Sequence, residues 1–361
     1  MESRFHTLEV SDIHRQTADA VAVSFQVPAE LRDTFRFIPG QFLTLRTHID
    51  GVDTRRSYSI CSGLDDPDLR VAVKKVDGGA FSSFVNHGLS AGMQLDVMPP
   101  EGRFTANLSA EAENAYVGFA SGSGVTPILS IIKSILAREP SGTFTLFYGN
   151  RAADSVIFRE ELEDLKDRYL KRFTLNHILS GEGQDIDLFH GRLDQEKVAR
   201  FAKGGLFSVS DTDRFFICGP GDMIEQVRTA LSDLAVSSEK ISFERFVPDG
   251  AAAAPRTASK KAQKIAEAGV NIEVVADGSR RNFTMTGSDT NVIDAAHRTG
   301  LELPYSCKGG MCSTCRCKVV EGEAEMAQNY SLERWELEAG FILACQSRPL
   351  SRRLVLDFDE V

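Results

Sequence analysis

The first hundred residues alternate between hydrophobic and polar positions in short runs. Such runs occupy 21–25, 41–45 and 70–74, and between them lie the pairs Pro39-Gly40 and Asp50-Gly51. A period of two is typical of half-buried strands, and the glycine and proline pairs favour turns. Regularly spaced strands of this length predict a small closed β-barrel, which we place at residues 1–110.

The pattern changes near residue 115, where apolar runs alternate with segments of helical spacing. Pro127 suits the first position of a helix, and isoleucines follow it at helical intervals. Alternating strands and helices predict a doubly wound α/β domain with a parallel sheet, at residues 111–246. The expected strands are 116–120, 143–148, 173–178, 214–218 and 241–246, and the expected helices are 127–138, 158–170, 194–202 and 222–234.

Residues 247–268 break this alternation with Pro248-Asp249-Gly250, four alanines and a cluster of lysines. This composition predicts a semi-flexible and partly helical linker. Beyond it, a hairpin is expected around Asp277-Gly278, a helix capped by residues 289–291 should run to His297, and a strand should occupy 317–320. Residues 269–361 therefore form a third, α+β domain in a chain whose fold class is multidomain β + α/β + α+β.

Composition excludes several classes of function. A chain of 361 residues with 42% hydrophobic residues has room for two or three globular domains. The net charge of −10 argues against a general affinity for nucleic acid or a membrane surface, and no run approaches the roughly 20 apolar residues of a membrane span. The N-terminus lacks the pattern of a signal peptide, and seven cysteines, an odd number, favour reduced thiols or metal ligands, so we expect a cytoplasmic protein.

Three cysteines near the C-terminus, Cys307, Cys312 and Cys315, have the spacing C-x4-C-x2-C, and Cys345 follows downstream. This is the ligand spacing of a plant-type [2Fe–2S] cluster. Glycines 309 and 310 let the backbone approach such a cluster, where a Cβ would clash. A zinc knuckle and buried free cysteines are the alternatives, but the chain has no second C-x2-C and no paired histidines nearby.

A second candidate site lies in the predicted barrel, in the segment 55–62. Arg56 can pair with a phosphate, Tyr58 can stack on a ring and Ser59 can donate a hydrogen bond to a ring nitrogen. An ordinary edge strand with solvated arginines explains the same residues. Gly79 and Ser82 belong to a glycine-rich turn into an expected helix, where free N–H groups favour an anion.

A third candidate site follows the first strand of the predicted α/β sheet. Gly122-Ser123-Gly124-Val125-Thr126-Pro127 lies where such sheets bind nucleotides, although it is not the full G-x-G-x-x-G pattern. Cys218-Gly219-Pro220 ends a later strand and should open onto the same crevice. Since no histidine is dedicated to Cys218, a small residue that shapes a nicotinamide pocket is favoured over a nucleophile.

Together these motifs resemble those of ferredoxin–NADP⁺ reductase-like flavoenzymes, here joined to a C-terminal plant-type ferredoxin domain. The combination is similar to the reductase components of multicomponent oxygenases. A narrower resemblance is to the reductase subunits of phenylacetyl-CoA 1,2-epoxidases, and reductases of Rieske dioxygenases and of steroid 9α-hydroxylases share the architecture. The narrower resemblance rests on the segments 5–8, 36–41, 147–151, 189–192, 244–246, 307–310 and 329–333.

The resemblance implies an FAD-binding β-barrel, an NAD(P)-binding α/β domain and a β-grasp ferredoxin domain. It implies that FAD is bound by Arg56, Ser57, Tyr58 and Ser59, together with Val73, Lys74, Gly79 and Ser82. It implies the nicotinamide nucleotide on Gly122, Gly124, Thr126, Pro127, Gly219 and Pro220, and the cluster on Cys307, Cys312, Cys315 and Cys345. Ser59, Cys218 and Phe246 are then expected beside the flavin and the nicotinamide, with no side chain that acts as a nucleophile.

The function implied is electron transfer from a reduced nicotinamide through FAD and the [2Fe–2S] cluster to a separate oxygenase. NADPH is expected rather than NADH, because Arg151 follows the second strand of the α/β sheet, where an acidic residue would favour the bare ribose. Arg192 is a second candidate for the 2′-phosphate. A redox sensor without turnover, and a donor to a reductive partner, are the alternatives.

Overall fold

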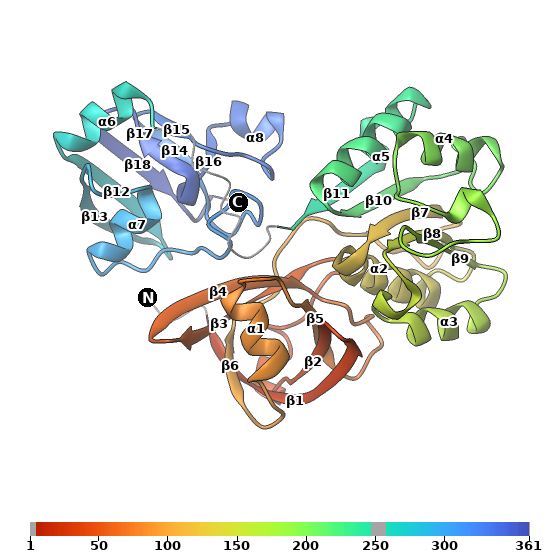
Figure 1. The fold of residues 1–361 in the computed structure, drawn as a ribbon. Helices are drawn as coiled ribbons and strands as arrows, with labels where there is room; N and C mark the ends of the chain where they lie inside the picture. Colours follow the sequence, from red (N-terminus) through yellow and green to blue (C-terminus); the bar gives the residue numbers. More distant parts are fainter. Residues whose placement is uncertain (1–4, 247–257, 361) are drawn as a thin grey trace. The chain divides into compact units, whose positions relative to one another are not determined.

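The computed structural model describes residues 5–246 and 258–360, and Figure 1 shows their helices and strands. The described residues form two compact units. One unit comprises 5–54 and 58–246, and the other comprises 258–360 together with the short segment 55–57. Of the predicted linker, residues 247–257 lie outside the described residues, and the remainder contains helix α6 (Lys260–Glu267).

A six-stranded antiparallel sheet forms the N-terminal part of the first unit and confirms the predicted barrel. Its strands follow the order β4-β3-β6-β1-β2-β5. A bridge between Ile60, which follows β4, and Val71 on β5 brings the two edges of the sheet together. The elements are β1 (His6–Thr17), β2 (Ala20–Gln26), β3 (Phe42–Ile49), β4 (Val52–Ser59), β5 (Leu69–Lys74), α1 (Ala80–His87) and β6 (Gln94–Val97).

The rest of the first unit is a sheet of five parallel strands in the order β11-β10-β7-β8-β9, as the alternation predicts. Successive side chains of a strand face opposite sides, so one core lies under α2 and α3 and another under α4 and α5. The elements are β7 (Ala115–Ser121), α2 (Val125–Arg138), β8 (Thr143–Asn150), α3 (Arg159–Arg168), β9 (Phe173–Leu179), α4 (Gln195–Lys203), β10 (Arg214–Gly219), α5 (Gly221–Asp233) and β11 (Ile241–Arg245).

Helix α2 begins two residues before the predicted start at Pro127. The turn η2 (Gly122–Gly124) runs directly into the helix, so that Pro127 becomes its third residue. A proline is tolerated there because the N–H groups of the first turn have no partner within the helix. The glycine-rich loop is therefore continuous with the helix that follows it.

The second unit contains a five-stranded sheet in the order β13-β12-β18-β14-β16. The predicted hairpin is confirmed, because β12 and β13 are joined by Asp277 and Gly278, both with positive φ (51° and 68°), which suits a tight two-residue turn. Asn291 caps α7 as expected by accepting from the Asp294 N–H at 3.0 Å. The elements are β12 (Val270–Ala276), β13 (Ser279–Met285), α7 (Val292–Arg298), β14 (Arg316–Glu321), β15 (Ala324–Met326), α8 (Arg334–Glu338), β16 (Phe341–Leu343), β17 (Ser347–Pro349) and β18 (Arg353–Asp357).

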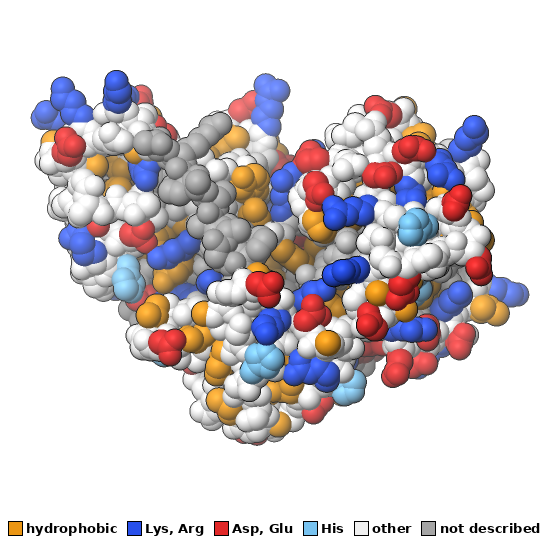
Figure 2. Space-filling view, in the orientation of Figure 1, with side chains coloured by type: hydrophobic (Ala, Val, Ile, Leu, Met, Phe, Trp, Pro, Cys, Tyr) orange, Lys and Arg blue, Asp and Glu red, His pale blue; other side chains and the backbone are white. Residues whose placement is uncertain are grey.

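Acidic and basic side chains are interspersed over the α/β domain on the face that Figure 2 shows. None of the helices in the described ranges combines the length and the apolar character that crossing a bilayer requires.

Candidate functional site

The glycine-rich loop after β7 lies against the end of β10. A Cβ on Gly124 would stand 2.1 Å from the carbonyl oxygen of Cys218, so only glycine lets the two segments approach this closely. Gly122 has a φ of +53°, and the Thr126 hydroxyl donates to the Ser123 carbonyl at 3.0 Å. The two predicted nucleotide segments, which are separated by about ninety residues in sequence, therefore meet at the carboxyl ends of adjacent strands.

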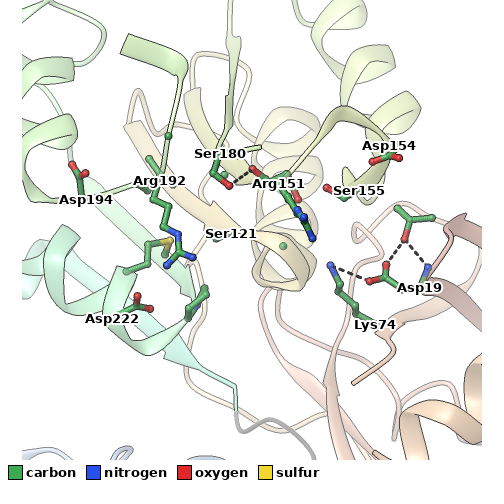
Figure 3. Close-up of a pocket in the computed structure, with 18 of the residues that line it drawn as sticks. Asp19, Lys74, Ser121, Arg151, Asp154, Ser155, Ser180, Arg192, Asp194 and Asp222 are labelled. Carbon is green, nitrogen blue, oxygen red and sulfur yellow. Dashed lines mark hydrogen bonds and ion pairs between the residues drawn. The ribbon is translucent and has the colours of Figure 1, made fainter. Parts of the chain in front are cut away.

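A cavity of about 850 Å³ opens beside this loop, and its lining comes from both parts of the first unit. The barrel contributes Thr17, Asp19 and Lys74, with the Lys74 ammonium 3.5 Å from the Asp19 carboxylate. Ser121, Gly122 and Pro220 of the α/β domain also line the cavity, and Figure 3 labels Ser121. The volume is within the roughly 300–1,000 Å³ of typical small-molecule sites.

Arg151 and Arg192 face this cavity from the loops after β8 and before α4 (Figure 3). Both side chains are exposed. Within the described ranges, neither guanidinium has a side-chain hydrogen bond or an ion pair. Two unpaired cations in one cavity favour a ligand that carries an anionic group there.

Ser59, at the end of β4, connects the barrel to the last strand of the α/β sheet. Its hydroxyl donates to a carboxylate oxygen of Glu244 on β11 at 3.1 Å. Desolvation by burial raises the pKa of Glu244 to about 8, and the Ser59 hydrogen bond opposes that rise. The side chain therefore keeps its proton to a higher pH than an ordinary glutamate. Glu244 is not among the predicted site residues. Its position at the end of a parallel strand, where such sheets bind ligands, could have identified it.

Cys218 is fully buried on β10. Burial first, and the neighbouring Glu244 carboxylate second, raise the pKa of the Cys218 thiol well above its ordinary value. A thiol that keeps its proton is a poor nucleophile, so this environment agrees with a space-filling role.

The other predicted flavin residues lie close to the start of α1. The half-buried ring of Tyr58 is 5.8 Å from the ring of Phe81, and Arg56 lies on the same face of β4 as Tyr58. The buried Ser82 hydroxyl accepts from the Val76 N–H at 3.2 Å and donates to the Gly79 carbonyl at 3.3 Å, which closes the glycine-rich turn. A ring and a helix start thus lie together in the barrel, and they fit a ligand with a flat ring and a phosphate.

The four predicted cluster cysteines form two pairs. Cys307 and Cys312 lie close enough for their side chains to interact, and so do Cys315 and Cys345. The interaction with Cys312 lowers the pKa of Cys307. In the ranges 5–246 and 258–360, no three His, Cys, Asp or Glu side chains surround a single ion site. Two pairs of thiols fit a cluster of two irons better than one zinc ion.

The backbone of the cysteine loop has an unusual conformation at several residues. Positive φ values occur at Gly310 (76°), Lys308 (49°) and Ser313 (57°), whereas Gly309 does not need one. The Gly309 N–H instead donates to the Cys307 sulfur at 3.3 Å. Cys317 is fully buried on β14 and stands apart from the pairs as expected, with its pKa raised by burial.

Comparisons with known proteins identify the family of the chain. Three family models match the chain, an oxidoreductase FAD-binding domain over 7–106, an oxidoreductase NAD-binding domain over 119–229 and a 2Fe-2S iron-sulfur cluster binding domain over 274–350. The chain is 43% identical to one of the subunits of 1,2-phenylacetyl-CoA epoxidase from Escherichia coli (strain K12), over 98% of both chains. The chain belongs to the iron–sulfur flavoprotein reductases.

Other members of this reductase family serve different oxygenases. The ferredoxin reductase component of 3-ketosteroid-9-alpha-monooxygenase from Rhodococcus rhodochrous is 33% identical, over 99% of this chain and 97% of the relative. The structure of phthalate dioxygenase reductase matches with a TM-score of 0.61 and 21% identity, over 98% of both chains, which supports the fold. The predicted fold class, the oxidoreductase activity and the FAD, nicotinamide and [2Fe–2S] cofactors are thus confirmed.

Proposed function

We propose that this reductase takes electrons from NADPH and delivers them to the oxygenase of a phenylacetyl-CoA epoxidase. The choice of epoxidase rests on the 43% identity to the Escherichia coli epoxidase protein across the whole length of both chains. The flavin and the cluster, when bound, supply the step from a two-electron donor to single electrons. We also propose that the FAD-binding domain ends at residue 110, the nucleotide-binding domain at 246 and the linker at 268.

The preference for NADPH is supported by the two unpaired arginines of the cavity. Neither Arg151 nor Arg192 forms an ion pair with a described side chain, and a 2′-phosphate could supply the negative charge for such a pair. Gly122, Gly124, Thr126, Gly219 and Pro220 would shape the site for the rest of the dinucleotide. No carboxylate partner has to be displaced from either arginine when the phosphate binds.

The other residues hold their ligands without forming bonds to the substrate. The segment Arg56–Ser59, with Val73, Lys74, Gly79 and Ser82, would bind FAD. Ser59 and Glu244, whose carboxyl has a raised pKa, lie close to Cys218 at the end of β10. Cys307, Cys312, Cys315 and Cys345 would hold the cluster in the two pairs described above.

The nucleotide preference is tested by Arg151→Ala. Loss of one charge-assisted hydrogen bond of about 1.5–3 kcal/mol should lower kcat/KM for NADPH about 10- to 100-fold. The value for NADH should stay unchanged, since NADH lacks the phosphate. Arg168→Ala, an exposed change on α3 outside the cavity, is the matched control. An unchanged ratio of the two kcat/KM values would contradict the assignment, and Arg192→Ala would then become the variant to measure.

The partner is tested by mixing the purified reductase with the oxygenase subunits of a phenylacetyl-CoA epoxidase. NADPH- and O2-dependent consumption of phenylacetyl-CoA is expected, and a 3-ketosteroid monooxygenase component should support less turnover. The reverse preference would support the second candidate function, a steroid hydroxylase reductase. That candidate rests on the 33% identity to the 3-ketosteroid-9-alpha-monooxygenase component. Failure to reduce cytochrome c or ferricyanide with either nucleotide would favour a sensor.

A further inference from the structure

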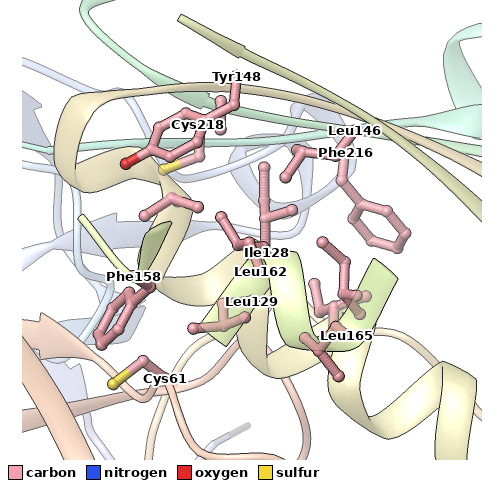
Figure 4. Packing of buried hydrophobic residues seen from close by; sticks show 14 of the residues in the cluster. Cys61, Ile128, Leu129, Leu146, Tyr148, Phe158, Leu162, Leu165, Phe216 and Cys218 are labelled. Atoms are coloured by element: carbon pink, nitrogen blue, oxygen red, sulfur yellow. The ribbon is translucent and has the colours of Figure 1, made fainter. Parts of the chain in front are cut away.

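The barrel and the α/β domain of the first unit share one apolar core. Cys61, Ala72 and Phe104 belong to the same buried cluster as Leu129 and Phe158. Figure 4 shows Cys61 below Phe158 and Leu129, where the segment after β4 approaches α2 and α3. This packing excludes water from the boundary between the two parts.

The loop 61–68, which directly follows the predicted flavin strand β4, is docked on one face of α2. The Ser130 hydroxyl donates to the Ser62 carbonyl at 2.6 Å, and the Leu64 N–H donates to the Ser134 hydroxyl at 3.2 Å. A Cβ on Gly63 would stand 2.8 Å from the Cβ of Lys133, so the contact is close. Positions 130, 133 and 134 are neighbours on a helix surface.

A chain of four alternating charges crosses the same boundary. Asp66 of the loop pairs with Lys133 of α2, and Lys133 pairs with Glu161 of α3 at 2.5 Å. Glu161 in turn accepts two hydrogen bonds from one nitrogen of Arg70 on β5, at 2.7 and 2.8 Å. These side chains are only 15–25% exposed, so salt screens them less than surface pairs. Lys133 thus forms ion pairs with two carboxylates, one from the loop and one from α3.

Phe158, which precedes α3, is strained at this boundary. It has a φ of +60°, which is an outlier for a bulky side chain, and its ring is buried. Its N–H donates to the side-chain oxygen of Gln16 on β1 at 3.2 Å, and the Arg70 guanidinium lies 5.1 Å from its ring centre. A strained residue persists only where its surroundings determine its conformation, so barrel side chains hold the start of α3 in place.

We propose that Lys133 and Glu161 are positioning residues for flavin reduction. The docked loop continues β4, on which Tyr58 and Ser59 lie, and α2 continues the nucleotide loop Gly122–Gly124. The charge chain therefore fixes the separation between the two surfaces that hold the hydride acceptor and the hydride donor. Hydride transfer depends on this separation, whereas anion binding by Arg151 and Arg192 uses one part alone.

The test is Lys133→Met, which keeps the aliphatic stem and removes both ion pairs. The limiting rate of flavin reduction in stopped-flow experiments should fall at least about 10-fold, because a misplacement of 1 Å can cost about 100-fold. The Kd of the nucleotide should stay within about twofold, since the arginine contacts remain. Lys133→Arg, which keeps the positive charge, should reduce the flavin at about the parent rate. Arg138→Gln, which breaks the exposed pair between the same helix and Asp65, is the matched control and should leave the rate unchanged.

Amide hydrogen exchange of the loop 61–68, measured without nucleotide, supplies a readout independent of turnover. Faster exchange is expected in Lys133→Met and not in Arg138→Gln. Unchanged flavin reduction despite faster exchange would overturn the proposal, and so would equal losses in both variants. If Lys133→Met does not fold, the isosteric Glu161→Gln carries the same expectations.

The inference rests on flavin reduction by a nicotinamide nucleotide, and the assay uses whichever nucleotide reduces the parent protein. A parent protein that neither NADPH nor NADH reduces contradicts the proposed function. A parent protein that is reduced normally, with Lys133→Met and Glu161→Gln equally fast, contradicts only the positioning role.

Discussion

The raised pKa of Glu244 makes the stability of the first unit depend on pH. In the folded protein its pKa is raised to about 8 from an ordinary value of 4.5. Between these values the folded protein holds one proton more than the unfolded chain. Raising the pH from 4.5 to 8 therefore favours unfolding, and the contribution is constant outside this window. Glu244→Gln removes the group and should remove this part of the pH dependence.

The size of the effect follows from the pKa difference. At about 1.4 kcal/mol per pH unit, a rise from 4.5 to about 8 gives an upper limit of about 5 kcal/mol. The side chain is half-buried, so water screens the charge, and we expect about 2 kcal/mol. For a unit of this size, 1 kcal/mol changes Tm by about 2–4 °C, so the expected change is about 4–8 °C.

The assay follows the release of FAD fluorescence on heating, because the flavin reports on the unit that contains Glu244. The difference in Tm between Glu244→Gln and the parent protein should grow by about 4–8 °C in favour of the variant from pH 5 to pH 8.5. Ser59→Ala removes the hydrogen bond that lowers the Glu244 pKa, so its Tm should keep falling to a higher pH than that of the parent. Parallel curves for the parent and Glu244→Gln would refute a raised pKa of the Glu244 carboxyl.

Two further substitutions probe the other sites. Cys345→Ser should abolish the visible absorbance of the cluster and the reduction of cytochrome c, while the rate of flavin reduction stays as in the parent; a joint loss would contradict independent sites in the two units. Gly124→Ala places a methyl group 2.1 Å from the Cys218 carbonyl oxygen, so we expect about 1–3 kcal/mol of lost stability and weaker nucleotide binding. Gly183→Ala, which has nothing within 4 Å, is its control, and titration calorimetry with NADP⁺ that shows equal affinity for both would exclude the clash.

Local signals in the sequence determined the elements and part of each site. The spacing of Cys307, Cys312 and Cys315 predicted one wall of the cluster, because three ligands on one short loop are neighbours in any fold. The regular alternation after residue 115 predicted the parallel sheet, and hence the crevice at the carboxyl ends of its strands. The start of α2 was placed two residues late, since a glycine turn that runs into a helix has no apolar period to reveal it.

The tertiary structure decided the contacts between residues that are remote in sequence. Glu244 lies 185 residues beyond Ser59, and the local sequence around neither residue predicts the hydrogen bond between them. The chain from Asp66 through Lys133 and Glu161 to Arg70 likewise joins a loop, two helices and a strand that become neighbours only after the barrel packs on the α/β domain. Periodicity reports which face of an element is buried, whereas the partner of a polar side chain depends on how the elements pack.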